Sequence, residues 1–168
     1  EEMDTIATEV QLTVLQPRES WERNGRWEKY GSGVFRTKAV DGSDMLLAPT
    51  AEEPVVDHAR QFIDLTNTLG FSLYQIGPKF RNEMRPRHGV LRGREFSMKD
   101  SYSFDVDEDG MSVSFESHRK VYGNIFRRLG LQTYEVRADS GAIGGTGSLE
   151  FMVAAEKIGD DILLLCKC

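Results

Sequence analysis

The chain has 168 residues, 39% of them hydrophobic and 29% charged, and its formal net charge is −6. This length is ordinary for one globular domain, which buries about 70% of the surface of its unfolded chain. The acidity argues against a protein that coats nucleic acid non-specifically, and no apolar run approaches the roughly 20 residues that cross a bilayer. We therefore expect a soluble domain with a core of its own and no membrane partner.

The two cysteines, Cys166 and Cys168, stand one residue apart near the end of the sequence. Two cysteines are too few to cross-link a small secreted fold, and these two are too close together for an unstrained disulfide. A structural zinc site needs four ligands, of which this pair would supply at most two. We therefore expect reduced thiols, as in a cytosolic protein.

The first part of the chain predicts a series of short elements. Residues 1–10 have helical apolar spacing, and residues 11–16 alternate as a strand that stops at Pro17. Residues 20–30 suit short helical turns that begin at Ser20, with both tryptophans packed in the core.

A hairpin and a helix follow. Residues 34–48 predict a hairpin around an Asp-Gly turn, and residues 50–67 predict a helix with one apolar face. Thr50 suits the N-cap of this helix, and Glu53 stands in capping-box spacing behind it. Helix initiation alone is therefore an alternative explanation of Thr50 and its neighbour Glu52.

The second half of the chain is richer in strands than in helices. Its predicted elements are strands at 72–84 and 91–100 around a basic loop at 85–90, a helix at 111–129, and strands at 131–137, 149–155 and from 162. Because the hairpins are closely spaced, we expect an antiparallel α+β domain rather than a doubly wound one.

The run from Phe80 to Phe104 is a basic island in an acidic chain. It holds six of the 21 basic residues, three of the 27 acidic ones and four aromatic residues. Residues two apart in a strand share a face, so Arg81 projects with Glu83, and Arg92 projects with Phe96. Guanidinium groups bind phosphate, a carboxylate accepts from the adenine amino group, and an aromatic ring stacks on a base. The island predicts a nucleotide site, with a cross-strand ladder of charges as the alternative.

Two segments of the island carry a family resemblance. Phe80-Arg-Asn-Glu83 and Arg92-Gly-Arg-Glu-Phe96 resemble motif 2 of class II aminoacyl-tRNA synthetases, and the run RPRHGVLRGREFSMKDSYSFD is very similar to that of bacterial-type prolyl-tRNA synthetases. The resemblance implies that Arg81 is catalytic and holds the ATP α-phosphate and the amino-acid carboxylate. It further implies that Glu83 binds the adenine amino group, Arg92 the γ-phosphate and Phe96 the adenine face. The loop residues implied to face the acceptor end of the tRNA are Arg85, Arg87 and His88.

The loop Leu47-Ala-Pro-Thr50-Ala-Glu52-Glu53 resembles the family's Thr-x-Glu loop, which binds the amino acid. The secondary ammonium of proline has two N–H donors, which the Thr50 hydroxyl and the Glu52 carboxylate can take. Residues 138–151 resemble the glycine-rich segment beside the prolyl pocket, which adds Glu150 to the implied proline-binding residues. Leu149 stands where many relatives carry His, so no histidine role is assigned there.

The resemblance also implies an organisation for the whole chain. Residues 1–168 would be a partial class II catalytic domain, truncated before motif 3. Its parts would be the end of motif 1 near 1–17, the amino-acid-binding loop at 47–53, motif 2 at 80–104 and the glycine-rich loop at 138–151. Motif 1 builds the dimer interface in this class, so a homodimer is implied. An editing insertion is expected to start after about residue 165, and an anticodon-binding domain is expected to be absent from residues 1–168.

The implied activity is that of a cytoplasmic proline–tRNA ligase. Such an enzyme activates L-proline with ATP to prolyl-adenylate and transfers it to tRNA(Pro), with Mg²⁺ as a further cofactor whose ligands the sequence does not identify. Two alternatives stay open: a noncatalytic synthetase-like binding module, and another class IIa synthetase such as a threonyl enzyme.

One acidic pattern points to different chemistry. Residues 105–110 (DVDEDG), with Glu116 beyond them, satisfy the spacing of an EF-hand calcium loop. The residues before the pattern read as a strand rather than an entering helix, and Ser112 takes a position that is usually aliphatic. We therefore expect an acidic turn that caps the following helix.

Overall fold

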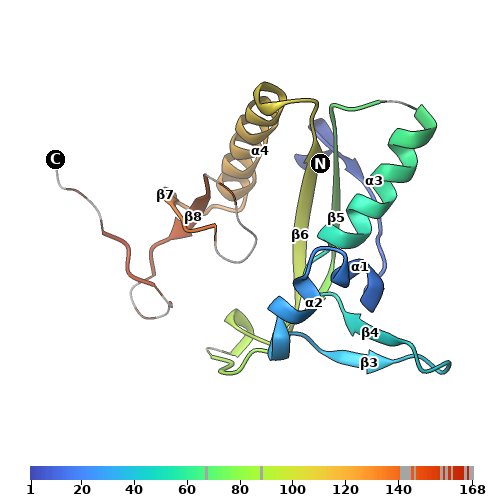
Figure 1. Ribbon diagram of the computed structural model, residues 1–168. Helices are drawn as coiled ribbons and strands as arrows, with labels where there is room; N and C mark the ends of the chain where they lie inside the picture. Colours follow the sequence, from blue (N-terminus) through green and yellow to red (C-terminus); the bar gives the residue numbers. More distant parts are fainter. Residues whose placement is uncertain are drawn as a thin grey trace. The chain divides into compact units, whose positions relative to one another are not determined.

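The computed structural model describes residues 1–66, 68–87, 89–140, 145, 147–155, 157, 159, 161–164 and 166. The chain forms two compact units, and their boundary falls between Ser114 and Phe115, inside helix α4 (Figure 1). Within the described ranges, no helix has both the length and the apolar character that a membrane span requires.

The first unit is built on a long two-stranded ribbon. Strands β5 (Phe71–Phe80) and β6 (Glu95–Phe104) pair antiparallel over their whole length, with Phe71 opposite Phe104 and Phe80 opposite Glu95. The short strand β1 (Thr8–Glu9) adds to β5 in parallel, so the sheet order is β1-β5-β6.

A second sheet has the order β2-β4-β3 and is antiparallel throughout. Its strands are β2 (Leu15–Pro17), β3 (Arg36–Lys38) and β4 (Asp44–Leu47). β3 and β4 form the expected hairpin, and Gly42 in its turn has a φ of 88°, a conformation that favours glycine. The N–H of Phe80 donates to the carbonyl of Ala48 at 2.8 Å, which joins the end of β5 to this sheet.

Two short helices pack their aromatic residues onto the second sheet. They are α1 (Arg18–Glu22) and α2 (Arg26–Lys29), and a 3-10 turn, η2 (Gly31–Gly33), follows them. Trp21 and Trp27 are buried with Leu46, which confirms that both tryptophans belong to the core. The predicted start at Ser20 is wrong, because α1 begins directly after Pro17 and the Ser20 hydroxyl donates to Asp57 instead.

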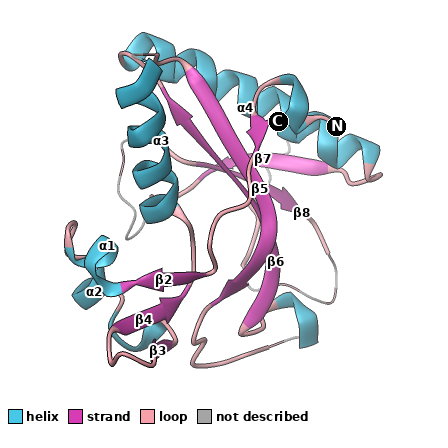
Figure 2. Cartoon of the chain, turned by 90° about the vertical axis from the view of Figure 1, so that its right-hand side faces the viewer, coloured by secondary structure: helices cyan, strands magenta, loops and turns pink. Residues whose placement is uncertain are grey.

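Helix α3 (Glu52–Thr66) lies along the β5–β6 ribbon (Figures 1 and 2). Its buried face consists of Val55 and Ala59, with Ala51 just before the helix. Two further apolar residues of this helix, Val56 and Phe62, are 44% and 43% exposed. Phe62 still packs on the ribbon, because the centre of its ring lies 5.1 Å from that of Phe71 on β5.

The N-terminal residues do not form the predicted helix. A single 3-10 turn, η1 (Met3–Thr5), precedes β1, because the backbone of this segment pairs with β5. The Tyr74 hydroxyl on β5 donates to Asp4 at 2.6 Å and holds the turn against the strand. A tertiary contact thus overrides the helical spacing of the sequence.

The second unit contains most of α4 (Glu108–Arg128) and the antiparallel pair β7 (Thr133–Arg137) and β8 (Leu149–Val153). The ring of Phe151 on β8 lies 5.4 Å from that of Phe126 on α4. Helix α4 starts three residues before the predicted position and ends before Gly130, as expected. The predicted strand from residue 162 is not present in residues 161–164, and Cys166 is disulfide-bonded, which contradicts the expected reduced thiol.

The antiparallel α+β class expected from the sequence is confirmed. The glycine-rich segment at 141–144 and residue 146, and the end of the chain at 165, 167 and 168, lie outside the described residues. The predicted prolyl-pocket loop and the expected start of an editing insertion fall on them.

Candidate nucleotide and amino-acid site

The five arginines of the island lie in a loop beyond the ribbon, whereas its one lysine, Lys99, lies on β6. β5 ends at Phe80 and β6 begins at Glu95, so the predicted second strand is present, but its predicted start at residue 91 is wrong. A 3-10 turn, η3 (Gly89–Leu91), and a separate bridge between Arg87 and Arg92 form the tip of this loop. The argument that alternate residues share a strand face therefore does not apply to the arginines of this loop.

Hydrogen bonds across the loop nevertheless bring the predicted nucleotide ligands together. The Arg81 N–H donates to the Arg94 carbonyl at 2.9 Å, and the Arg94 guanidinium donates to the Glu83 carbonyl at 3.2 Å. The Glu83 carboxylate lies 3.3 Å from Arg92 Nε and accepts from the Arg85 N–H at 3.3 Å. Glu83 and Arg92, to which the family resemblance gives different parts of ATP, are paired with each other in this structure.

Arg81 stands at the root of the loop beside an aromatic ring. Its Nε donates to the Pro49 carbonyl at 3.2 Å, and its guanidinium carbon lies 5.4 Å from the centre of the Phe96 ring. The side chain is exposed and Phe96 is half-buried. Because Nε is already used, the terminal nitrogens of Arg81 are the groups that an anionic ligand would meet.

The Pro49 contact connects the hairpin to the predicted amino-acid loop. Pro49, Thr50 and Ala51 link β4 to α3, and all of them are buried. The Gln16 side chain donates to the Thr50 carbonyl at 3.3 Å and fixes the loop from the side of β2. Arg81 therefore bonds to Pro49, the residue next to Thr50, although Thr50 and Arg81 are 31 positions apart in the sequence.

Arg26 on α2 holds the two carboxylates at the start of α3. Its Nη1 lies 2.8 Å from Glu53 Oε1 and 3.4 Å from Glu52 Oε2. The guanidinium also stacks 5.0 Å from the Trp21 ring and 5.1 Å from the Tyr30 ring. The capping box is wrong, since the Glu53 carboxylate binds Arg26 rather than the backbone before the helix. The sequence reasoning missed Arg26, which lies far from both glutamates in the chain.

A buried polar network connects the ribbon to the same loop. Asp100 on β6 accepts from Lys79 Nζ at 2.8 Å, from the Gln75 amide at 2.9 Å and from the Tyr102 hydroxyl at 2.5 Å. The Tyr102 oxygen accepts from the Ala51 N–H at 3.2 Å. Burial and the hydrogen bond to Asp100 raise the pKa of Tyr102 well above its ordinary value. The sequence reasoning missed this network. The available signal was the presence of a lysine and an aspartate, Lys79 and Asp100, inside two strands, because such residues are rarely buried without a partner.

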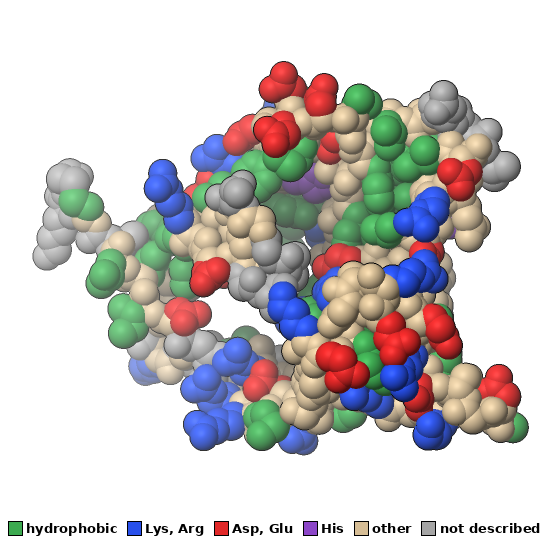
Figure 3. All heavy atoms as spheres, viewed as in Figure 1, with side chains coloured by type: hydrophobic (Ala, Val, Ile, Leu, Met, Phe, Trp, Pro, Cys, Tyr) green, Lys and Arg blue, Asp and Glu red, His purple; other side chains and the backbone are tan. Residues whose placement is uncertain are grey.

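The other predicted site residues are less closely connected. Glu150 lies exposed on β8, opposite Val136, in the second unit. Arg85 and Arg87 are exposed in the hairpin loop, and His88 lies outside the described residues. Figure 3 shows Lys and Arg side chains gathered over this loop.

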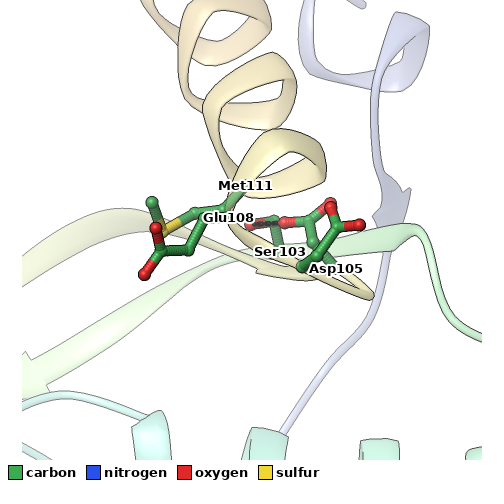
Figure 4. A pocket seen from close by; sticks show the side chains of 5 residues that line it. Ser103, Asp105, Glu108 and Met111 are labelled. Atoms are coloured by element: carbon green, nitrogen blue, oxygen red, sulfur yellow. Dashed lines mark hydrogen bonds between the residues drawn. The ribbon is translucent and has the colours of Figure 1, made fainter.

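The acidic segment before α4 does not form a calcium loop. α4 begins at Glu108, inside the EF-hand pattern, and β6 precedes it where that motif has a helix. The Asp107 carboxylate accepts from the Gly110 N–H at 2.8 Å, as a helix cap does. Figure 4 shows the shallow pocket at this site, and Asp105 there accepts from Ser103 at 2.7 Å. In the described part of the chain, no group of three or more His, Cys, Asp or Glu residues is placed to hold a metal ion.

Comparison with known proteins identifies the family. The model of the tRNA synthetase class II core domain (G, H, P, S and T) matches residues 35–164, and the chain belongs to this family. It is 48% identical over 167 residues to the Proline--tRNA ligase of Cupriavidus taiwanensis, and 50% identical over 167 residues to that of Delftia acidovorans. The Proline--tRNA ligase of Nautilia profundicola is 50% identical over 168 residues. Each comparison covers 99% of this chain but only 29% of the relative's length.

Proposed function

We propose that the protein is a cytoplasmic proline–tRNA ligase, which activates L-proline with ATP and transfers the prolyl group to tRNA(Pro). The observation that carries this proposal is the Arg81–Pro49 hydrogen bond, which ties the arginine of the hairpin to the Thr50–Glu52 loop. An enzyme that joins an amino acid to a nucleotide must hold both substrates within bonding distance of each other.

The proposed reaction needs positioning and charge neutralisation rather than a side-chain nucleophile. The proline carboxylate attacks the α-phosphorus of ATP, a new C–O–P linkage forms, and the bond to pyrophosphate breaks. Arg81 would hold the carboxylate and the α-phosphate through its terminal nitrogens, while Glu83, Arg92 and Phe96 bind the rest of ATP. Release of Arg92 from Glu83 would then accompany ATP binding, because the two are paired in this structure.

The amino-acid end of the proposed site uses the loop before α3. Glu52, half-buried beside Arg26, and the hydroxyl of Thr50 would accept the two N–H donors of the proline ammonium group. Glu150 would complete the proline-binding residues, and a homodimer through the region of residues 1–17 would complete the assembly.

Magnesium belongs to this proposal as a partner of ATP. The described residues offer no cluster of carboxylates for it. Mg²⁺ commonly binds substrate phosphates and water with few protein ligands. The bound ion would neutralise phosphate charge.

Amino-acid-dependent exchange of pyrophosphate into ATP tests the proposal, using the protein that carries this sequence at its full length. We expect exchange that requires proline and falls by at least about a hundredfold in Arg81→Ala, since the lost guanidinium contacts both substrates. Arg60→Ala, which removes an exposed arginine from α3, serves as the matched control and should leave exchange unchanged.

Three results would contradict the proposal. Exchange that threonine rather than proline stimulates would indicate another class IIa synthetase. Exchange that persists in Arg81→Ala would remove that residue from the reaction. Binding of ATP and proline without any exchange would identify a noncatalytic module.

A further inference from the structure

Two carboxylates and one guanidinium group meet at the start of α3. Arg26 Nη1 lies 2.8 Å from Glu53 Oε1, whereas its distance to Glu52 Oε2 is 3.4 Å. Arg26 Nη2 donates to the Tyr30 hydroxyl at 2.8 Å and lies 3.5 Å from Glu52 Oε2. The guanidinium is therefore bonded closely to Glu53 and Tyr30 and only loosely to Glu52.

Burial decides which carboxylate keeps the guanidinium. The side chain of Glu53 is 1% exposed, and that of Glu52 is 27% exposed. The other donor to Glu53 is the neutral Asn24 amide at 3.0 Å, and within the described residues Glu53 Oε2 is buried without a hydrogen-bond partner. A shift of Arg26 toward Glu52 would leave the buried Glu53 carboxylate without its cation, which is strongly unfavourable. Glu53 therefore holds Arg26.

Glu52 thus keeps most of its capacity to bind a cation. Among the residues that the structure describes, Arg26 is the only hydrogen-bond or ion-pair partner of the Glu52 carboxylate, and both contacts are made by Oε2. Two carboxylates and one guanidinium leave one negative charge in excess, and it lies on the more exposed of the two glutamates. A ligand at Glu52 therefore meets an anion that the neighbouring arginine does not neutralise.

We propose that Glu53 is a positioning residue that draws Arg26 away from Glu52, so that the amino-acid site keeps its negative charge and selects a ligand with a cationic amine. This inference rests on the proposed function, in which Glu52 accepts from the ammonium group of proline. Glu53 acts through Arg26 and is too deeply buried to meet the substrate itself.

The test compares proline with cyclopentanecarboxylate, which has the same ring size and carboxylate but a carbon atom in place of the ammonium nitrogen. The KM for proline and the inhibition constant of the analogue are both measured by pyrophosphate exchange, on the protein that carries this sequence at its full length. In Glu53→Gln, the amide still accepts a hydrogen bond but no longer offsets the charge of Arg26, which turns to Glu52. We expect the preference for proline over the analogue to fall about tenfold, with the KM for ATP unchanged.

The preference ratio separates this role of charge from a loss of packing. A loop that had only loosened would bind both ligands less well in parallel, and an unchanged ratio in Glu53→Gln would overturn the inference. Asp57→Asn is the matched control, because it removes a carboxylate of the same helix whose partners are Arg23 at 2.6 Å and Ser20 at 3.2 Å. Its ratio should equal that of the unaltered protein, and an equal fall in both variants would also overturn the inference.

A second variant, Tyr30→Phe, keeps the inference testable if Glu53→Gln does not fold, as judged by thermal unfolding. Phenylalanine keeps an aromatic ring beside the guanidinium but removes the hydroxyl that accepts from Arg26 Nη2, so that nitrogen is left with Glu52 as its partner. We expect the ratio to fall about threefold, and an unchanged ratio in the folded variant would refute the role of Arg26 placement.

The proposed function and this inference fail in different ways. Exchange in the unaltered protein that ignores proline would overturn both. Proline-dependent exchange whose preference ratio is the same in the unaltered protein, Glu53→Gln and Tyr30→Phe would overturn the inference alone.

Discussion

Arg26 shows how one side chain connects the packed core to the start of α3. Its guanidinium is 13% exposed, lies over two aromatic rings and is paired with Glu53, which is 1% exposed. The second oxygen of Glu53 is buried and has no hydrogen-bond partner in the part of the chain that the structure describes. Such a pair contributes little net stability when intact, but loss of one partner leaves a buried charge uncompensated.

We expect Glu53→Ala to lower the free energy of unfolding by about 3 kcal/mol, because Arg26 then has only the longer ion pair with Glu52 and its hydrogen bond to the Tyr30 hydroxyl. Urea denaturation of the two proteins measures the difference. Glu22→Ala is the control, since Glu22 pairs with Arg18 at the surface and should cost less than about 1 kcal/mol. Equal losses in the two variants would show that burial does not distinguish these ion pairs.

At the scale of an element, the effect of a glycine on stability depends on whether it lies inside a helix or just after it. Gly123 in α4 and Gly130 after α4 illustrate the two cases. Gly123 lies inside the helix with open space where a Cβ would project. Gly130 follows the helix with a φ of 74°, and the Leu131 N–H donates to the Phe126 carbonyl at 2.9 Å in the pattern of a glycine-terminated helix.

Alanine at these positions should therefore have opposite effects on stability. We expect Gly123→Ala to stabilise the protein by up to about 1 kcal/mol through helix propensity. Gly130→Ala should destabilise it by about 1 kcal/mol, because alanine resists a positive φ. Thermal unfolding of both variants checks the signs, and a stabilising Gly130→Ala would contradict the described end of α4.

At the scale of the element, the β5–β6 hairpin was predicted only in part from the alternation of residue types. The periodicity of β5 and β6 predicted two long antiparallel strands correctly. It did not predict that Arg92 and Arg94 lie before β6, since the loop forms its own bridge and 3-10 turn. These bonds depend on how the loop folds back on itself, which no alternation of residue types records.

For the whole molecule, the distribution of charge is more informative than its sum. The net charge is −6, yet exposed arginines gather over the β5–β6 loop (Figure 3). Charges of the same sign on a loop attract a polyanion locally even when the rest of the protein repels it.

If this loop meets tRNA, as the family resemblance implies, the double substitution Arg85→Ala and Arg87→Ala should weaken tRNA binding. Each lost phosphate contact should also make the decline of the logarithm of the binding constant with the logarithm of salt concentration shallower by about 1. Filter binding at several salt concentrations measures both effects, and proline-dependent pyrophosphate exchange should be unchanged. Arg60→Ala is again the control, and an unaltered salt slope in the double variant would exclude this loop from the RNA interface.

The sequence by itself determined the α+β class, the hairpins, the buried tryptophans and the family resemblance. These features depend on local periodicity, turn residues and runs of specific residue types, all of which can be read along the chain. It also identified Thr50, Glu52, Arg81 and Phe96 as one candidate site, although it offered helix capping as a competing explanation of the first two.

Only the tertiary structure decided how these residues are held. It shows that Glu53 pairs with Arg26 rather than forming a capping box, and that Arg92 and Arg94 precede β6. It also shows that Asp100 and Tyr102 connect to the loop before α3 through Ala51. The physical reason is that a buried polar group bonds to the partner that folding brings within reach. Glu53 lies 27 positions from Arg26, and Tyr102 lies 51 positions from Ala51.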